Sequence, residues 1–418
     1  MILGRDFFGE IIVAQKKHRL ATLYPSQDTM RTDFYSIVLT STLVLVVNCF
    51  NLDRELQNFD QSLLETKSNE RSSKLFPLFS VLIRNVQCLP EASENVAGTC
   101  STNSQCRNSG GVASGACANG FGVCCVVTYS CEDSARQNNS NFRNRDYPSG
   151  FNPTGLEVCN LRIQKPSSNV CQIRLDFTNM QLAAADPITG QCMNDRLSIN
   201  GVSGTVPSNL CGDLSQQHMY LDYGSSDRIT LSVITDGGGV VQARQWNVRL
   251  TYLECNSLSR APDGCLQYFM SATGEVRMLG YPMNAHLADL DYTVCVRSED
   301  GAGSIVWSPC QGEPIASAFL MSGAPLTDPT MGTPGASGAC SADYVLIMTD
   351  DPQATPTKLD DRYCGNALAA MMPPFLVRSI AKPFIMRVRT DSLEDAADMT
   401  NTGFCLAFRQ EPPRPQAG

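Results

Sequence analysis

Apolar and polar residues alternate along several short segments of the chain. In residues 171–177, single polar residues separate Ile173, Leu175 and Phe177, and residues 246–252 repeat this pattern. An apolar residue at every second position is typical of a β-strand with one buried face. Further strands are predicted at residues 229–234, 344–348 and 384–388, and clusters of Gly, Pro, Asn and Asp separate the strands. Short strands joined by such turns predict antiparallel sandwiches and an all-β fold class.

The cysteines divide most of the chain into three groups of six. The groups are Cys88, Cys100, Cys106, Cys117, Cys124 and Cys125; then Cys131, Cys159, Cys171, Cys192, Cys211 and Cys255; then Cys265, Cys295, Cys310, Cys340, Cys364 and Cys405. The second and third groups have nearly the same order of short and long gaps. Local motifs also match, because Cys192 and Cys340 each precede an Asp by three residues, and Cys211 and Cys364 each precede a Gly. These matches indicate an internal duplication of a domain of ~130–150 residues.

The remaining cysteine, Cys49, belongs to an apolar run at the beginning of the chain. Residues 37–50 contain no charge, but these 14 residues are too few to span a bilayer as a helix. The run has the length of the apolar part of a signal peptide, and Met30 followed by Arg31 predicts the translation start. An uncleaved signal anchor is the alternative. No later segment is apolar enough to cross a membrane, so we expect no membrane span in the mature chain.

Composition favours an extracellular protein and argues against nucleic acid as a partner. The net charge is -9, and no basic stripe is present that could neutralise a phosphate backbone. Many dispersed cysteines are typical of an oxidising compartment. Removal of Cys49 with the signal peptide leaves 18 cysteines, an even number that allows every one to be paired. We therefore predict a secreted protein.

The first six cysteines define a small module without a hydrophobic core. The segment from Cys88 to Cys125 contains almost no large apolar side chain, so cross-links must hold it together. Zinc is the competing interpretation, but the segment has no histidine and no facing CxxC pairs. Six cysteines allow fifteen pairings, and sequence alone does not select one. Because neighbouring cysteines do not readily bond to each other, Cys124 and Cys125 must have different partners.

The two duplicated segments resemble CUB domains. Residues 142–163 look like a CUB opening, in which a Tyr-Pro pair precedes a Cys and alternating apolar residues, and the Cys-x-x-Asp and Cys-Gly elements look like later parts of that domain. The chain is similar in particular to insect secreted proteins with paired, divergent CUB domains. The resemblance implies two antiparallel jelly-roll-like sandwiches. The small module is similar to a clip domain, although its loop between the third and fourth cysteines is short and no serine protease follows it.

These observations predict the organisation of the chain. We expect an N-terminal extension and signal peptide at 1–50, a flexible spacer at 51–87, a clip-like module at 88–125, CUB-like domains at 126–258 and 259–412, and a tail at 413–418.

The resemblances also imply disulfide partners. A typical CUB domain pairs its first cysteine with its second and its third with its fourth. The pairs implied in this way are Cys131–Cys159, Cys192–Cys211, Cys265–Cys295 and Cys340–Cys364. The clip pattern implies Cys88–Cys124, Cys100–Cys117 and Cys106–Cys125. The extra cysteines lie at the ends of alternating segments, and we predict the bonds Cys171–Cys255 and Cys310–Cys405; a bond between Cys255 and Cys265 would contradict this prediction.

The sequence contains no recognisable catalytic motif. Only His218 and His286 follow the predicted start, neither lies near a nucleophile motif, and we expect both to be surface loop residues. We therefore predict no enzymatic activity. Some CUB domains bind calcium through one Glu and two Asp. By resemblance the aspartates would be Asp195 and Asp236 in the first copy and Asp343 and Asp391 in the second, whereas the Glu position holds Ala183 in the first copy. Asn138 is the one glycosylation acceptor sequon that we identify.

The favoured function is non-enzymatic recognition of an extracellular protein or glycan by loops at the sandwich ends. We expect contact residues in the loops at 323–339 and 183–190, which have the least strand character. Two alternatives remain open. The chain is a structural matrix component, or it is a non-catalytic cofactor of a clip-protease cascade; the fold resemblance does not choose between these functions.

Overall fold

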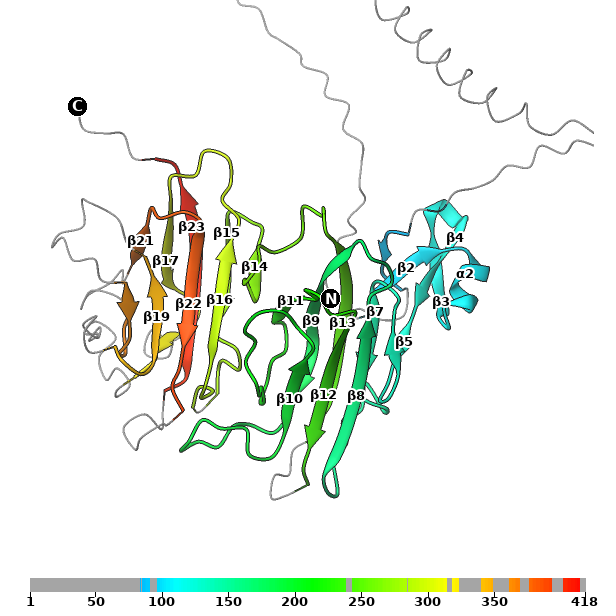
Figure 1. Cartoon of the computed structure of the whole chain (residues 1–418), viewed down its shortest axis with the longest axis horizontal. Coiled ribbons are helices and arrows are strands. Elements are labelled where there is room, and N and C mark those ends of the chain that lie inside the picture. Colours follow the sequence, from blue (N-terminus) through cyan, green and yellow to red (C-terminus); the bar gives the residue numbers. More distant parts are fainter. Residues whose placement is uncertain are drawn as a thin grey trace, which may run out of the picture. The chain divides into compact units, whose positions relative to one another are not determined.

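The chain is described by a computed structural model (Figure 1) that covers residues 83, 85–90, 96–237, 243–283, 285–313, 318–322, 340–348, 361–368, 376–392 and 401–413. This part of the chain is built almost entirely of β-strands, and its helices are the short α2 (Asn103–Asn108) and the 3-10 turn η1 (Ala118–Gly120). The predicted all-β fold class is therefore confirmed. The predicted signal peptide, Met30 and the loop at 323–339 lie outside the described residues. None of the helices just named is long and apolar enough to cross a membrane.

The small module is a four-stranded sheet whose interior consists largely of disulfides. Its strands are β1 (Gln87–Cys88), β2 (Gly98–Ser101), β3 (Val112–Cys117) and β4 (Gly122–Val126), in the order β1-β2-β4-β3. Thr102 begins α2 with a capping box, because its hydroxyl accepts the N–H of Gln105 while the Gln105 side chain accepts the N–H of Thr102. Cys100, Cys106 and Cys124 are at most 1% exposed. Sulfur thus fills the positions where a larger domain has aliphatic side chains.

The first sandwich follows directly. Its strands are β5 (Thr128–Tyr129), β6 (Ser134–Ala135), β7 (Ser140–Arg143), β8 (Glu157–Gln164), β9 (Val170–Gln181), β10 (Arg196–Asn200), β11 (His218–Asp222), β12 (Arg228–Thr235) and β13 (Gln245–Glu254). One sheet has the order β10-β12-β8-β6, and the other has the order β11-β9-β13-β7-β5. The short strands β5 and β6 pair in parallel with β7 and β8, and all other pairs are antiparallel.

The alternation of apolar and polar residues in the sequence gives each of these sheets one buried face and one outer face. Ile173, Leu175 and Phe177 of β9 are fully buried in the core, as are Leu161 and Ile163 of β8 from the other sheet. Successive side chains of a strand point to opposite faces, so the polar residues between them lie on the outer face. Burial of each large apolar side chain contributes about 1.5–3 kcal/mol to folding.

The second sandwich contains the remaining strands. They are β14 (Gln267–Phe269), β15 (Thr273–Arg277), β16 (Asp291–Val296), β17 (Ser304–Pro309), β18 (Phe319–Leu320), β19 (Tyr344–Ile347), β20 (Arg362–Tyr363), β21 (Val377–Ser379), β22 (Phe384–Arg389) and β23 (Gly403–Glu411). Their orders are β14-β16-β22-β19-β20 and β15-β23-β17-β21, with β18 paired to β23. Strand by strand, β6-β8-β12-β10 corresponds to β14-β16-β22-β19, and β11-β9-β13-β7 corresponds to β21-β17-β23-β15.

The matched Cys-Gly elements have the same conformation in both sandwiches. Gly212 and Gly365 have φ angles of 76° and 86°, a region that favours glycine. The carbonyl of Gly212 accepts the N–H of Leu182, and the carbonyl of Gly365 accepts the N–H of Met321. The motif therefore recurs because the turn requires a residue without a Cβ atom.

The 18 cysteines of the three groups form nine disulfides. The bonds are Cys88–Cys124, Cys100–Cys117, Cys106–Cys125, Cys131–Cys159, Cys171–Cys255, Cys192–Cys211, Cys265–Cys295, Cys310–Cys405 and Cys340–Cys364. These partners are the ones that the sequence analysis expects. The pairing in the secreted protein stays a prediction, which peptide mapping tests.

Candidate functional site

The outer face of the β11-β9-β13-β7 sheet carries polar side chains from three neighbouring strands, β9, β13 and β7. Its members, which we call the polar face, are Arg143, Arg174, Asp176, Thr178, Asn247, Arg249 and Thr251. The strand register places Arg174 opposite Thr251, Asp176 opposite Arg249, and Asn247 opposite Arg143. Directly paired residues point to the same side of a sheet, so these side chains form one continuous surface.

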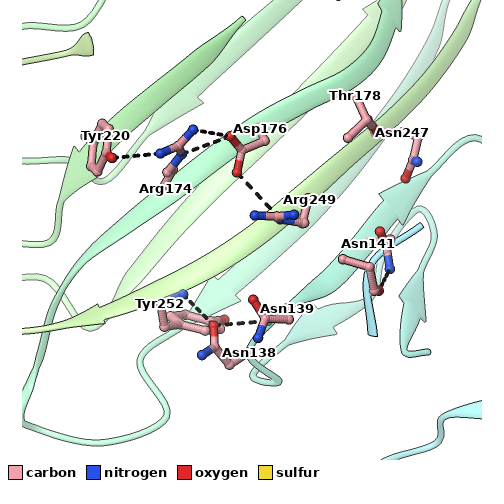
Figure 2. Close-up of polar contacts among 11 residues, drawn as sticks. Asn138, Asn139, Asn141, Arg174, Asp176, Thr178, Tyr220, Asn247, Arg249 and Tyr252 are labelled. Carbon is pink, nitrogen blue, oxygen red and sulfur yellow. Dashed lines mark hydrogen bonds and ion pairs between the residues drawn. The ribbon is translucent and has the colours of Figure 1, made fainter. Parts of the chain in front are cut away.

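Three charged side chains at the centre of the polar face form one network (Figure 2). Arg174 donates from Nε to Oδ1 of Asp176 over 2.8 Å and from Nη1 to the Tyr220 hydroxyl over 3.0 Å. On the next strand, Nε of Arg249 lies 3.6 Å from Oδ2 of Asp176. The side chains of Arg174, Asp176 and Arg249 are 29%, 19% and 25% exposed. The network is thus half-buried, and its members hold one another in fixed positions.

The network keeps its arginine charged. Burial opposes the charge of Arg174, but Asp176 and Tyr220 together raise the pKa of its guanidinium above the ordinary value. Burial also raises the pKa of the Tyr220 hydroxyl, which therefore stays protonated at neutral pH. With Arg143, Arg174 and Arg249 against Asp176, the polar face is positive on a chain whose net charge is -9.

Several polar atoms of this face have unused hydrogen-bonding capacity. Nη2 of Arg143, Nε of Arg249 and Oγ1 of Thr251 are shielded from water and have no hydrogen-bond partner among the described residues. Arg143 donates from Nε to the Asn247 side chain, and Thr178 donates to the Asn247 carbonyl. The protein covers these atoms, so a ligand would contact the exposed parts of the Arg143 and Arg249 side chains.

The polar face lies between two other parts of the chain. At β11, Nε2 of His218 lies 3.1 Å from the Tyr268 carbonyl oxygen at the beginning of the second sandwich. At β7, Nδ2 of Asn141 donates over 3.0 Å to the carbonyl of Ala97 in the small module. The polar face is therefore bounded on both sides by side-chain contacts to backbone carbonyls of neighbouring parts of the chain.

The equivalent face of the second sandwich has a different character. Its outward positions also hold charged side chains, because the register places Val306 opposite Arg378 and Arg409, and Ala407 opposite Ser308 and Glu275. The charges of this face are paired differently, since Arg378 and Arg409 both form ion pairs with Glu411. Sequence reasoning assigned Arg174 and Asp176 to a water-facing side but did not select them as a site, because their neighbours on β11 and β13 are distant in the sequence.

The loops expected to contact a ligand are only partly described. In the loop at 183–190, the Asp186 carboxylate accepts the N–H groups of Ile188 and Thr189, which lowers the pKa of Asp186. The Gly190 carbonyl accepts the N–H of Ala288 in the second sandwich over 2.9 Å. This loop therefore has an internal structural role, and contact with a ligand remains a prediction.

The expectation of surface histidines is wrong. His218 lies in β11 and is 9% exposed, and His286 is 2% exposed. Nε2 of His286 lies 3.2 Å from the Met321 carbonyl oxygen, and Nε2 of His218 contacts the backbone of Tyr268. Burial, together with the nearby Arg174, lowers the pKa of His218 to about 4. Both histidines are packing residues of the fold.

The predicted calcium ligands of the first sandwich are engaged in another interaction. Asp195 is fully buried, and its Oδ2 accepts Nε of Arg244 and the N–H of Ala183, each over 2.7 Å. Its Oδ1 accepts the N–H of Asp236 over 3.0 Å. A calcium ion at Asp195 would have to displace the guanidinium or bind beside it against charge repulsion. The residues present here therefore do not fit a calcium ion.

The second sandwich repeats part of this arrangement. Asp343 is 4% exposed, and its Oδ1 accepts the N–H of Asp391 over 2.9 Å. This bond matches the one between Asp195 and Asp236. Calcium at Asp343 and Asp391 stays a prediction.

The family comparison concerns the second sandwich. Residues 262–411 match the family model of the animal CUB domain. The resemblance to a CUB domain is thereby confirmed for the second copy. A comparison with the curated proteins finds no match to the sequence.

Three solved structures, two of them of CUB domains, match parts of the chain. The CUB1-EGF-CUB2 domains of rat MASP-1 are 13% identical, with a TM-score of 0.23, over 68% of this chain and 99% of that chain. A MASP-1 CUB2 domain bound to Ca2+ is 19% identical, with a TM-score of 0.24, over 29% of this chain and 98% of that chain. The extracellular region of zebrafish Gpr126/Adgrg6 is 13% identical, with a TM-score of 0.23, over 66% of this chain and 36% of that chain.

Asn138, the predicted glycosylation site, lies at an exposed turn before β7. Its Oδ1 accepts the N–H groups of Tyr252 and Asn139, over 2.8 and 3.0 Å (Figure 2). Both bonds use the amide oxygen, so neither occupies Nδ2, the atom that carries an N-linked glycan.

We expect the protein secreted from animal cells to carry a glycan at Asn138. Treatment with peptide-N-glycosidase should lower its mass, and the Asn138→Gln variant should show no such change. Ser140→Thr keeps the acceptor sequon and serves as the control. An unchanged mass after treatment of the wild-type protein would contradict the prediction.

Proposed function

We propose that this chain is a non-enzymatic, secreted binding protein whose polar face contacts an acidic segment of another extracellular protein. The single observation that carries the proposal is the polar face itself. Three arginines and one aspartate from neighbouring strands form a half-buried surface with a net positive charge. Arginine is enriched in protein interfaces, and its planar donor group suits the carboxylates of a partner.

Charge complementarity favours an acidic protein segment as the occupant. The polar face has a net positive charge, whereas the chain as a whole is negative. A partner that presents carboxylates would neutralise Arg249 and Arg143, whose side chains are partly exposed. A sulfated or acidic glycan is the competing occupant, and the experiment below separates the two.

The proposal also includes secretion of the protein, a CUB-like identity for the first sandwich and a clip-like identity for the small module. Nine disulfides require an oxidising compartment, which supports the extracellular assignment. The first sandwich has the strand order of the CUB domain at 262–411, which supports its interpretation as a divergent CUB domain. The three disulfides of the small module support its likeness to a clip domain.

Charge reversal on the polar face should abolish ligand capture. The immobilised full chain is exposed to extracellular fluid of the source organism, and bound proteins are identified by mass spectrometry. We expect the Arg143→Glu, Arg249→Glu double variant to lose the partner that the wild-type protein retains, and raised salt to weaken the wild-type interaction. Arg228→Glu, at an exposed position of β12 in the other sheet, is the matched control and should retain the partner.

Two results would contradict the proposal. Equal capture by the double variant and the wild-type protein would exclude the polar face. Loss of the wild-type interaction after enzymatic removal of glycans from the fluid would assign the occupant as a glycan instead of a protein segment.

A further inference from the structure

Arg244 lies at the end of the first sandwich where four strands terminate. Its guanidinium is 1% exposed, and the carboxylate it contacts, that of Asp195, is 0% exposed. Nε of Arg244 donates to Oδ2 of Asp195 over 2.7 Å, and Nη2 donates to the Asp236 carbonyl oxygen over 3.1 Å. Burial of both charges is costly unless they are paired and hydrogen-bonded. Both conditions are met here.

The contacts of this pair reach four separate strands. Asp195 immediately precedes β10, and Asp236, whose N–H it binds, immediately follows β12. Ala183, whose N–H it also binds, lies just beyond the end of β9. Arg244 immediately precedes β13, and its backbone exchanges two hydrogen bonds with Phe151. One buried carboxylate and one guanidinium thus fix the ends of β9, β10, β12 and β13.

A cation is required at this position because Asp195 is buried without access to water. We infer that Arg244 is the permanent cation of this sandwich end, and that the first sandwich folds and keeps its loops in place without a metal ion. The carbon chain of Arg244 connects this charge covalently to the fold, so no dissociable ion is needed. The stability of this end is therefore independent of calcium concentration.

The two tryptophans of the chain provide a separate reporter for each sandwich. Trp246 lies in β13, two residues after Arg244, and Trp307 lies in β17 of the second sandwich. In a Trp307→Phe background, tryptophan fluorescence reports the unfolding of the first sandwich alone. The full secreted chain is used in every measurement.

The first test compares unfolding of this background in calcium and in EDTA. We expect the same Trp246 transition midpoint in both solutions, because no metal binds at Asp195. A midpoint that rises with calcium would overturn the inference. A second measurement is titration calorimetry with calcium on the Asp343→Asn, Asp391→Asn variant. This variant lacks the candidate calcium ligands of the second sandwich. Saturable calcium binding to that variant would also overturn the inference.

The second test changes the guanidinium itself. Arg244→Gln should lower the Trp246 midpoint substantially, because Asp195 then remains buried without a cation. Arg244→Lys keeps the charge but loses the forked donor geometry. Its Trp246 midpoint should therefore fall between that of Arg244→Gln and that of the protein with Arg244 unchanged. Arg249→Gln, an arginine of the same strand region on the half-buried polar face, is the control and should lower the midpoint least. An Arg244→Gln midpoint equal to that of the Arg249→Gln control would contradict the assignment of Arg244 as the cation of this end. If Arg244→Gln is not secreted, the comparison of unfolding in calcium and in EDTA still tests the inference.

Discussion

Replacing Cys171 and Cys255 together by alanine should lower the free energy of unfolding by about 4 kcal/mol. The bond joins the beginning of β9 to the residue after β13, the two central strands of the five-stranded sheet, and it spans 84 residues of sequence. A cross-link over a long segment removes many conformations from the unfolded chain, so its loss favours unfolding. Denaturant unfolding followed by Trp246 fluorescence measures the change.

The bond Cys310–Cys405 of the second sandwich provides an internal comparison. It spans 95 residues and joins the residue after β17 to the beginning of β23, so it cross-links the corresponding strands at their opposite ends. Its removal should cause a loss of similar size in the transition reported by Trp307, with little change in that of Trp246. A loss below about 1 kcal/mol in both sandwiches would contradict the chain-entropy explanation.

Acidification should destabilise the first sandwich through His218, by up to about 3 kcal/mol. Burial among Tyr220, Phe269 and the Tyr268 backbone lowers the folded-state pKa of His218 to about 4, from the ordinary value of 6.5. A histidine whose folded pKa is lowered favours its neutral form in the folded state. Its contribution to stability is therefore complete above pH 6.5 and is lost progressively as the pH falls toward 4.

Unfolding of the wild-type protein and of His218→Gln at several pH values isolates this effect. Carboxylates titrate in the same pH range, but their contribution is common to both proteins. We expect a smaller loss of stability between pH 6.5 and 4 in the variant than in the wild-type protein. Parallel pH profiles of the two proteins would show that His218 is not responsible.

The long strands could be predicted from the sequence, whereas the short ones could not. A strand such as β9 alternates over many residues, and this pattern alone shows which face is buried. β5 and β6 contain two residues each, and pairing with β7 and β8 defines them. Such strands depend on a partner elsewhere in the chain, so their own sequence contains little signal.

The candidate site shows the same limit. The partners of Asp195 were not predictable, because Arg244 lies 49 residues away in sequence and looks like one more polar residue after a glycine-rich turn. His218 follows three polar residues in sequence, and its burial arises from contact with Tyr268, 50 residues away. The local sequence pattern indicates strands and turns. Whether a polar residue is exposed or buried is determined by long-range packing.

Site-specific photo-cross-linking tests the proposed binding surface most directly. A benzophenone amino acid is placed at Thr251 on the polar face, or at Thr230 of β12 in the other sheet, both half-buried threonines of the first sandwich. The full chains are irradiated in the presence of the captured partner. We expect a cross-linked partner peptide that is rich in Asp and Glu from position 251 and none from position 230. Cross-links from position 230 alone would contradict binding at the polar face.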